Sequence, residues 1–323
     1  MPATPHRLKA KRFPLLRRPD QRPEEPDWIG LLPPGRNILR SLRVFRRLLL
    51  VLLITVVGLP VQAVMLLLPG PAKELWPRLF WSTMCRLIGL SVQVIGEPAH
   101  RTADGRPIVY VSNHSSWLDI LVLGGCLRAC FIAKEDVTRW PLIATIARLG
   151  RSVFIQRRRA STGRERDDMS TRLARGDSLI LFPEGTTSDG ARVMPFRSAF
   201  LSIAELPVTP DGLPPLVQPV SVVYDRIAGL PIGRANRPLF AWYGDMDLAS
   251  HFWRLAQQCG LRVTVVLHTA LDPRAFPNRK ALAAATWEAT ANGAATLRQN
   301  RKAVPLTPAG AEQAAESARP AYA

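Results

Sequence analysis

The segment PIVYVSNHSSWLDI, residues 107–120, decides the fold class of this chain. Its first half is apolar and rich in β-branched residues, as in a buried strand, and this half ends at Asn113. Polar residues follow, and then apolar residues at helical spacing: Ile120, Leu121 and Leu123. A strand that turns directly into a helix is the repeating unit of α/β proteins. Sites in such proteins lie at the carboxyl ends of the strands, where His114 stands.

Strand-like runs recur on both sides of this segment and are separated by stretches of helical periodicity. This alternation predicts an α/β fold, with a central mixed, largely parallel sheet flanked by helices. The predicted strands are 91–96, 107–113, 130–134, 152–157, 178–182, 216–224, 239–244 and 261–268. The predicted helices are 117–127, 139–149, 165–175, 196–206 and 279–300. We assign residues 91–300 to one domain and the Pro- and Ala-rich residues 301–323 to a flexible tail.

The composition narrows the class of partner. The chain has 323 residues, of which 47% are hydrophobic and 21% charged, so wholesale disorder is excluded. Its 43 Lys and Arg against 25 Asp and Glu give a net charge of +18, which indicates an anionic partner. That partner is either nucleic acid or an anionic membrane surface with acidic substrates. The sequence lacks the aromatic-and-basic patterns of nucleic-acid modules, so we expect anionic membrane lipid and no nucleic acid.

The four cysteines are too few and too scattered for a disulfide framework or a paired zinc site. They are Cys85, Cys126, Cys130 and Cys259. We interpret them as reduced thiols in a cytosolic compartment. Cys126 and Cys130 are spaced one helical turn apart, and we expect both to be small core residues of a helix.

The N-terminal part divides into two segments. Residues 1–47 are basic and Pro-rich, and we expect a mostly disordered arm. The run LLLVLLITVVGLPVQAVMLLL, residues 48–68, then contains no charged residue and is long enough to cross about 30 Å of hydrocarbon. It begins too late and is too long for a secretory signal peptide.

Positive charge flanks this apolar run on both sides, whereas a single span has one side richer in Lys and Arg. Pro60 interrupts the run, and the following amphipathic stretch carries Trp76 and Trp81, which favour the membrane interface. We therefore assign residues 48–90 to membrane-anchoring helices that are re-entrant or interfacial. A buried core helix is the alternative, but it would be unusually long for an uncharged one.

His114 and Asp119 are the first candidate catalytic pair. On a regular helix five residues correspond to about 500°, so the two side chains would not share a face. They meet only if His114 lies in the turn before the helix and folds back. Asp119 would then hold one ring nitrogen and leave the other free to act as a general base.

Two further blocks follow strands. Gly150 to Arg157 ends in a guanidinium, whose planar fork of donors suits phosphate. The block FPEGTTS, residues 182–188, follows another apolar strand, and its glycine permits a tight turn with exposed N–H groups. Such a turn can cradle an oxyanion. Each block taken alone also fits an ordinary basic face or loop.

Together the three blocks resemble the motifs of the glycerophospholipid acyltransferase family, in particular of bacterial 1-acylglycerol-3-phosphate acyltransferases. The matching residues are Asn113, His114 and Asp119; Gly150, Phe154, Ile155 and Arg157; and Phe182, Pro183, Glu184, Gly185, Thr186 and Ser188. A weaker fourth motif matches the apolar strand around Pro219. One position departs from the family, because Thr187 replaces an arginine. Arg192 or Arg197 could substitute for it, or the acceptor could differ, since Thr187 also resembles the lyso-ornithine lipid branch.

The resemblance implies an O-acyltransferase in which His114 is the general base and Asp119 orients it. The implied substrate-binding residues are Asn113, Ser116, Phe154, Arg157, Glu184, Gly185 and Thr186. No cofactor and no metal is implied, with acyl-CoA or acyl carrier protein as the acyl donor. The acceptor would be a lysophospholipid, first of all 1-acylglycerol-3-phosphate, which yields phosphatidic acid, with lyso-ornithine lipid as the alternative. We expect the enzyme at the inner membrane, facing the cytosol.

Two other classes of protein fit the sequence less well. A membrane-tethered protein that only binds anions would explain the charge, but it leaves the three motifs without a role. A serine hydrolase is disfavoured because the chain contains no Gly-x-Ser-x-Gly sequence beside its histidines.

Overall fold

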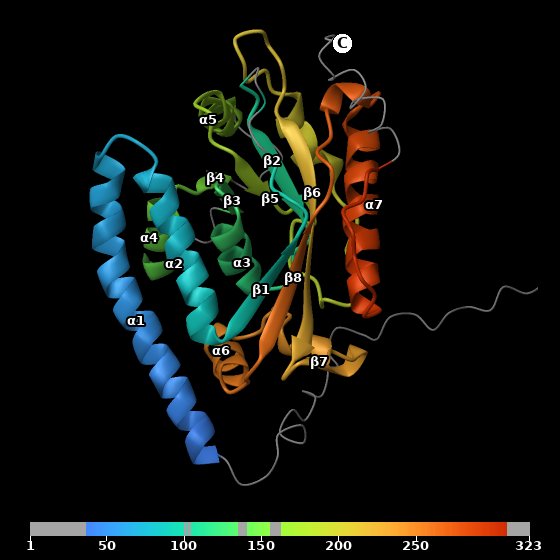
Figure 1. The fold of residues 1–323 in the computed structure, drawn as a ribbon. Coiled ribbons are helices and arrows are strands. Elements are labelled where there is room, and N and C mark those ends of the chain that lie inside the picture. The colour runs from blue at the N-terminus through green and yellow to red at the C-terminus, as the bar shows by residue number, and fades with distance from the viewer. Residues whose placement is uncertain (1–36, 100–101, 103–104, 135–140, 156–162, 309–323) are drawn as a thin grey trace, which may run out of the picture. The chain divides into compact units, whose positions relative to one another are not determined.

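An eight-stranded sheet forms the centre of the computed structural model, which describes residues 37–99, 102, 105–134, 141–155 and 163–308 (Figure 1). The strands are β1 (Leu90–Ile95), β2 (Ile108–Ser112), β3 (Cys130–Lys134), β4 (Val153–Ile155), β5 (Leu179–Leu181), β6 (Leu216–Ile227), β7 (Leu230–Pro231) and β8 (Leu261–Leu267). Their order is β1-β8-β6-β2-β5-β3-β4, and β7 pairs with β6. Only the β6–β7 and β6–β8 pairs are antiparallel. The predicted mixed, largely parallel sheet is confirmed.

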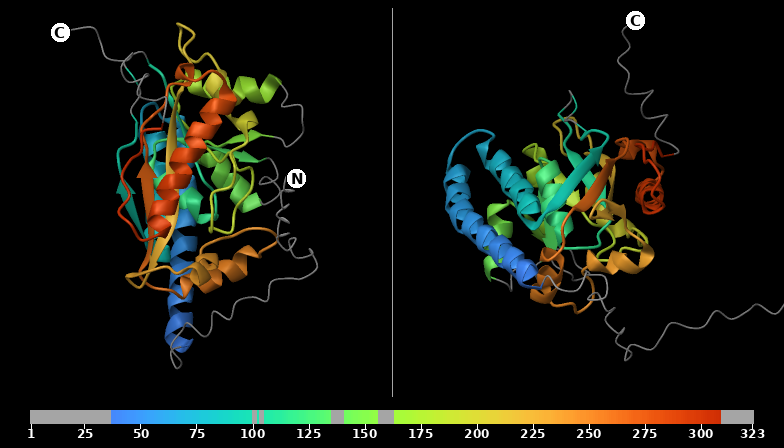
Figure 2. Two further views of the ribbon diagram at one scale, coloured as in Figure 1. Left: turned by 90° about the vertical axis from the view of Figure 1, so that its right-hand side faces the viewer. Right: turned by 60° about the horizontal axis from the view of Figure 1, so that its bottom comes forward.

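Helices cover both faces of this sheet (Figures 1 and 2). The α-helices are α1 (Asn37–Leu67), α2 (Ala72–Ile88), α3 (Leu118–Cys126), α4 (Pro141–Leu149), α5 (Gly163–Ala174), α6 (Leu248–Ala256) and α7 (Arg279–Arg298). Three 3-10 helices are η3 (Ser198–Glu205), η4 (Arg234–Leu239) and η5 (Pro273–Ala275). Helix α7 packs on β6 from one side, and α2 and α3 lie on the other. Gly124 of α3 lets this second layer pack closely, because a Cβ there would meet the Trp81 ring of α2 at 2.4 Å.

Residues 40–323 form one compact unit by their contacts, and 1–39 form another, of which only Asn37–Leu39 are described. Helix α1 begins at Asn37, inside the segment that was expected to be a disordered arm, residues 1–47. It continues unbroken through Pro60. From Ile38 to Leu67 it is long and apolar enough to cross a membrane, by length and composition alone. The chain turns only after Leu67 and then enters α2.

The polarity of α1 is inverted relative to an ordinary surface helix. Its buried polar residues are Arg47, Thr55 and Gln62. Its exposed apolar residues include Leu42, Phe45, Leu49, Leu52, Leu53, Val56, Val57 and Val64. A surface helix in water places its apolar stripe against the core, so this outward stripe requires an apolar environment or partner.

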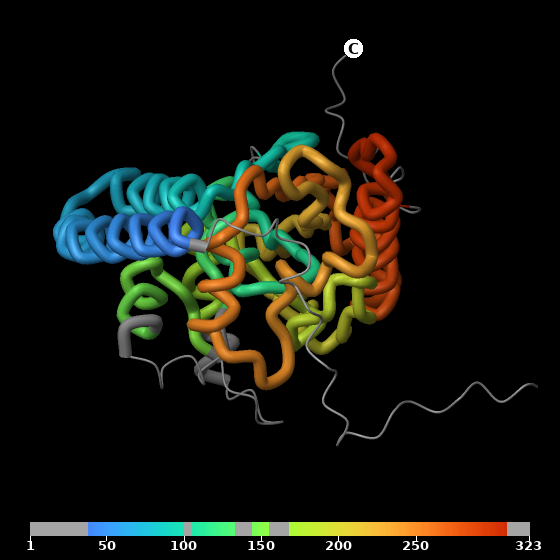
Figure 3. Tube along the Cα trace, turned by 90° about the horizontal axis from the view of Figure 1, so that it is seen from below, coloured from blue at the N-terminus to red at the C-terminus, as the bar shows by residue number. Residues whose placement is uncertain are grey.

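Helix α1 is tied to the rest of the unit at two distant points. Arg47 donates to the carbonyls of Ala256 (2.8 Å) and Gln258 (2.8 Å), at the carboxyl end of α6, where a cation is favoured. Gln62 donates to the carbonyl of Leu149 (2.9 Å) at the end of α4. At 1.5 Å per residue these two attachment points lie roughly 22 Å apart along the helix. Figure 3 shows α1 beside α2 along one flank of the unit.

Two local predictions are wrong. Residues 239–244 form no strand, because Phe240 stacks on Tyr224 and the chain crosses the end of β6 instead of pairing with it. Cys126 and Cys130 do not share a helix, since Cys126 ends α3 and Cys130 begins β3. Both thiols still have raised pKa values, near 11, because they are buried.

The beginning of the predicted flexible tail is also packed against the domain. Among residues 301–308, Ala303 is buried, and Leu306 exchanges hydrogen bonds with the segment after β8. The Leu306 N–H donates to Nδ1 of His268, and the Leu306 carbonyl accepts from the Thr269 N–H. Residues 309–323 lie outside the described part of the chain.

Candidate active site

The end of β2 is fastened to β6 by the side chain of Asn113. Its Nδ2 donates to the Val222 carbonyl (3.0 Å), and its Oδ1 accepts from the Val222 N–H (2.8 Å). Both hydrogen-bonding groups of this buried amide are therefore used inside the protein. Asn113 was predicted to bind substrate. In the structure its side chain fixes the point at which the chain leaves the sheet, one residue before His114.

His114 and Asp119 meet. The His114 Nδ1 lies 2.9 Å from Asp119 Oδ2, so the turn folds back as the sequence predicts. The fold-back has a clear cause, because the same carboxylate oxygen accepts the N–H groups of Ser115 (2.7 Å) and Ser116 (2.9 Å). Asp119 stands in the first turn of α3, where the partial positive charge of the helix also favours a carboxylate.

The second oxygen of Asp119 is held from the sheet. Tyr224 on β6 donates its hydroxyl to Asp119 Oδ1 at 2.6 Å. The pKa of this phenol is raised well above its usual value, first by burial and next by the charge of Asp119, so it stays a donor at neutral pH. With its side chain fully buried, the Asp119 carboxylate is compensated by these donors and by the His114 ring.

This arrangement sets the tautomer of His114. Because a carboxylate with several N–H and O–H donors acts as an acceptor, the His114 Nδ1 carries the proton, and Nε2 presents its lone pair. No described residue forms a hydrogen bond with Nε2. The side chain is 18% exposed, and Phe182 stacks on the ring with centroids 4.1 Å apart. The ring is thus fixed in orientation yet open at one nitrogen, which suits proton abstraction from a hydroxyl.

The turn after β5 clamps the backbone of His114. Glu184 Oε1 accepts the His114 N–H (2.9 Å), and the Ser188 N–H donates to the His114 carbonyl (2.9 Å). The other oxygen of Glu184 accepts the Met194 N–H at 3.3 Å. Burial raises the pKa of Glu184 to about 8. Glu184 was predicted to bind substrate; in the structure its two oxygens accept one N–H from His114 and one from Met194.

Comparison with known proteins supports an acyl-transfer site. A sequence profile of the Acyltransferase family matches residues 91–223, which hold all three motifs. A lyso-ornithine lipid O-acyltransferase of Rhizobium meliloti (strain 1021) is 38% identical over 235 residues, covering 72% of this chain and 79% of the relative. Another from Brucella abortus (strain 2308) is 35% identical and covers 75% of this chain and 90% of the relative.

This chain belongs to the glycerophospholipid acyltransferase family. A 1-acyl-sn-glycerol-3-phosphate acyltransferase of Neisseria gonorrhoeae is also similar, with 30% identity over 60% of this chain and 70% of the relative. The crystal structure of the 1-acyl-sn-glycerophosphate acyltransferase of Thermotoga maritima has the same fold, with a TM-score of 0.58. It is 22% identical and covers 82% of this chain and 98% of that one.

The remaining residues of the family motifs divide by position. Ser116 is fully buried, and its hydroxyl accepts the Leu118 N–H (3.4 Å) rather than facing outward. Gly185 adopts a φ of +74°, so the turn uses its freedom from a Cβ, and Thr186 beside it is exposed. Phe154 lies half-buried in β4, and Arg157 lies outside the described residues.

Thr187 lacks the positive charge of the arginine that it replaces, and the guanidinium of Arg197 lies beside the same turn. The Arg197 guanidinium carbon lies 3.4 Å from where a Cβ on Gly185 would stand, and Arg197 is exposed. The Arg197 N–H also donates to the Pro183 carbonyl (3.0 Å), which fixes its backbone to the turn. Of the two candidates Arg192 and Arg197, the structure places Arg197 at the turn.

Sequence reasoning missed Tyr224 and Phe182 as parts of the site. Tyr224 is 105 positions from Asp119, and no local pattern connects a tyrosine in one strand with a carboxylate in a distant helix. Phe182 was noted only as a motif position. Among the described residues, no group of three or more His, Cys, Asp or Glu gathers in a way that could hold a metal ion.

Proposed function

We propose that this protein transfers a fatty acyl group from a thioester donor to the free hydroxyl of a lysolipid, with His114 as general base. The observation that carries the proposal is the 2.9 Å contact between His114 Nδ1 and a buried carboxylate, combined with an open Nε2. Nε2 accepts the proton of the acceptor hydroxyl as its oxygen attacks the thioester carbonyl. The carbon–sulfur bond then breaks, and the imidazolium returns the proton to the leaving thiolate. The products are an ester and a free thiol.

Asp119 has two effects in this step. It holds the Nδ1–H tautomer, which keeps Nε2 basic, and its charge stabilises the imidazolium that forms. Neither effect requires a covalent acyl-enzyme, a cofactor or a metal. We therefore propose direct transfer from the donor, which is acyl-CoA or acyl carrier protein, to the acceptor.

We propose lyso-ornithine lipid as the acceptor and 1-acylglycerol-3-phosphate as the second candidate. The sequence alone favoured the phosphate-bearing acceptor. Two findings shift the preference: relatives named as lyso-ornithine lipid O-acyltransferases reach 38% and 35% identity, and Thr187 removes the arginine of the third motif. The Neisseria gonorrhoeae relative, named for 1-acyl-sn-glycerol-3-phosphate, keeps the second candidate open at 30% identity.

The acceptor assay tests this directly. Purified enzyme in mixed micelles receives oleoyl-CoA with lyso-ornithine lipid, with 1-acylglycerol-3-phosphate, or with no acceptor, and the lipids are identified by mass spectrometry. The free thiol released is measured in parallel. We expect one ester for each thiol, and the higher kcat/KM with lyso-ornithine lipid. Thiol release that yields free fatty acid, or no product with any acceptor, would contradict acyl transfer.

We further propose that α1 lies in the plane of the membrane with its apolar stripe in lipid. Both attachment points of α1, at Arg47 and at Gln62, bind the same domain roughly 22 Å apart along the helix. A helix that crossed the bilayer would carry these points to opposite leaflets, and the domain cannot occupy both. The in-plane position leaves the catalytic domain on one side, which we propose is the cytosolic face of the inner membrane, where acyl thioesters are made.

Charge inserted in the apolar stripe tests the membrane contact. The double variant Leu52→Glu with Val56→Glu places two carboxylates on the exposed side of α1. Because apolar burial in lipid drives this binding, we expect sedimentation with anionic vesicles to fall by more than tenfold. The matched control is Ala284→Glu on the exposed side of α7, which should bind vesicles as the wild type does. Equal binding by both variants would refute the assignment.

Labelling distinguishes the in-plane position from a span. Cysteines are introduced singly at Ser41 and Gly70, at the two ends of α1, with the exposed Cys259 replaced by Ser. In sealed inverted membrane vesicles a thiol reagent that cannot cross the bilayer should modify both. Modification of only one end would show that α1 crosses the membrane.

A further inference from the structure

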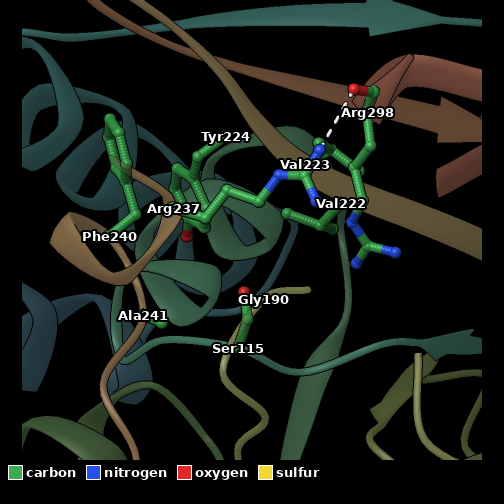
Figure 4. A pocket seen from close by; sticks show the side chains of 9 residues that line it. All are labelled: Ser115, Gly190, Val222, Val223, Tyr224, Arg237, Phe240, Ala241 and Arg298. Atoms are coloured by element: carbon green, nitrogen blue, oxygen red, sulfur yellow. Dashed lines mark hydrogen bonds between the residues drawn. The ribbon is translucent and has the colours of Figure 1, made fainter. Parts of the chain in front are cut away.

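A small pocket opens beside the catalytic pair, and most of its lining lies outside the three motifs. It encloses about 300 Å³, open solvent included. Its lining includes Ser115, Gly190, Tyr224, Arg237, Phe240 and Arg298 (Figure 4). Two of these residues also hold the catalytic carboxylate: the Ser115 N–H and the Tyr224 hydroxyl both donate to Asp119. The pocket is therefore directly adjacent to the site of proton transfer, because Ser115 and Tyr224 belong to both.

The pocket exists because β6 is longer than β2. The last residue of β2, Ser112, pairs with Val220, whereas β6 continues to Ile227. Between Val220 and Arg226, where the short strand β7 pairs with β6, no described strand covers that edge of β6. Arg298 reaches the gap from the last turn of α7, and Arg237 reaches it from η4. Arg237 Nη2 donates to the backbone carbonyl of Arg298 (3.2 Å), and this bond ties the Arg237 side chain to the end of α7, as Figure 4 shows.

These two guanidinium groups have no acidic partner within the described part of the chain: neither takes part in an ion pair there. The buried Nε of Arg298 has no hydrogen-bond partner among the same residues. Burial, followed by the charge of Arg237, lowers the pKa of Arg298 to about 10, so it is still charged at pH 7. The acids nearby are Glu184, whose raised pKa near 8 leaves it largely neutral, and the exposed Asp189.

Two cations without an ion-pair partner among the described residues share this part-buried pocket, and such a pair suits an anion. We propose that Arg237 and Arg298 bind the anionic head group of the acceptor lipid while its hydroxyl lies at His114. The proposal rests on the function proposed above. It adds an acceptor subsite that the family motifs do not contain, since both arginines lie beyond residue 223, where the family profile ends. Planar guanidinium forks suit a carboxylate or a phosphate.

This subsite also fits the acceptor preference. An ornithine head group carries a carboxylate and an ammonium group. The arginines would bind the carboxylate, and the exposed Asp189, next to Gly190 of the pocket lining, would face the ammonium. A phosphate head group would bind the same two arginines and make no use of Asp189. The acceptor series below separates the two anions from each other and from an uncharged lipid.

The test compares Arg237→Gln and Arg298→Gln with two control variants, Arg234→Gln and Arg301→Gln. The controls remove exposed arginines from the same two regions without touching the pocket lining. KM is measured for lyso-ornithine lipid, 1-acylglycerol-3-phosphate, an uncharged monoacylglycerol and the acyl donor. Loss of a hydrogen bond to a charged group should raise KM for the preferred anionic acceptor by about tenfold or more. KM for the monoacylglycerol and the donor should stay as in the wild type, and so should all values for the controls.

The outcomes are separable. An unchanged KM for both anionic acceptors, an equal rise for the uncharged lipid, or a rise for the donor instead would overturn the subsite. Failure of the wild type on every acceptor would overturn the proposed function itself. If Arg298→Gln does not fold, Arg298→Lys is used in its place. It keeps the charge without the planar fork and should raise the same KM by a smaller factor. Arg237 is less buried, and Arg237→Gln tests the subsite independently of Arg298.

Discussion

His114 and His268 both stand within two residues of a strand end, yet their surroundings differ completely. His268, directly after β8, uses both ring nitrogens: Nδ1 accepts the Leu306 N–H (3.0 Å), and Nε2 lies 2.8 Å from the Ser221 hydroxyl. Ser221 in turn donates to the Thr290 carbonyl of α7 (2.8 Å). Burial lowers the pKa of His268 to about 4. His114 instead faces a carboxylate with one nitrogen and leaves the other open.

The difference teaches how to tell a catalytic histidine from a structural one. A histidine next to a serine, buried and hydrogen-bonded, resembles part of a hydrolase site when only the residue types are considered. At His268 every polar atom is already used and no carboxylate would stabilise an imidazolium, so the residue joins β8, β6, α7 and the tail. At His114 the fixed ring, the charge balance and the open nitrogen are all present. The predictions below test this contrast.

The largest effect is expected for Asp119→Asn. The change removes the charge that balances the imidazolium and lets the ring take the wrong tautomer, so kcat should fall by about 10² to 10⁴. The control is Asp177→Asn, which breaks an ion pair with Arg151 (2.6 Å) far from His114 in the sequence and outside the site. The control should lose stability and keep its kcat. Steady-state assays on folded protein decide between these outcomes, and equal kcat values for the two variants would remove Asp119 from the mechanism.

A smaller effect is expected for Tyr224→Phe. The ring and its stacking on Phe240 remain, but Asp119 Oδ1 loses the donor at 2.6 Å. A hydrogen bond to a charged group has a modest net worth, so kcat should fall by about tenfold, with little change in either KM. The pH dependence of kcat separates this role from a structural one, because Tyr224 acts through the carboxylate that holds the His114 ring. If Tyr224→Phe has the kcat and the pH profile of the wild type, Tyr224 has no role in positioning Asp119.

His268→Ala should affect stability and leave chemistry intact. The substitution leaves the buried Leu306 N–H without its acceptor and opens a cavity beside Gly293, so the free energy of unfolding should fall by about 2 kcal/mol. Thermal unfolding in detergent measures the loss. A variant that is stable but has lost turnover would mean that His268 takes part in the reaction.

The smallest effect is a dependence of stability on pH. The pKa of His268 is about 4 in the folded protein, against about 6.5 when unfolded. The unfolded chain therefore takes up a proton first, and the stability that His268 contributes above pH 6.5 is lost as the pH falls toward 4. Glu184, whose pKa is raised, and His251, whose pKa is lowered, also make stability depend on pH. Their effect is the same in wild type and in His268→Ala, so it cancels in the difference between the two. The stability difference between the two should shrink over this range, and a constant difference would contradict the assignment.

The sequence was sufficient for the parts of the fold that depend on local pattern. Alternating strands and helices predicted the mixed sheet, and the spacing of His114 and Asp119 showed that the two could meet only in a turn that folds back before the helix. Contacts between distant segments could not be predicted. The role of Tyr224 depends on the strand order, which brings β6 beside β2, and the pairing of Arg237 with Arg298 depends on where α7 ends.

Residues 239–244 show why pattern fails where packing decides. The apolar sequence LFAWYG suits a strand, but Phe240 is buried against Tyr224, and the Trp242 N–H donates to the Ser115 carbonyl (2.8 Å). In the same way Glu184 and Asn113 have the residue types of ligand-binding groups. Their hydrogen-bonding atoms are nevertheless consumed by the backbone of the site, which only the three-dimensional contacts reveal.

The most direct test measures kcat for His114→Ala and His268→Ala side by side in mixed micelles, with each value corrected for the folded fraction. The account predicts that His114→Ala keeps wild-type thermal stability and loses about 10² to 10⁴ in kcat, while folded His268→Ala turns over at the wild-type rate. Acyl transfer by His114→Ala at a rate close to that of the wild type would contradict the account.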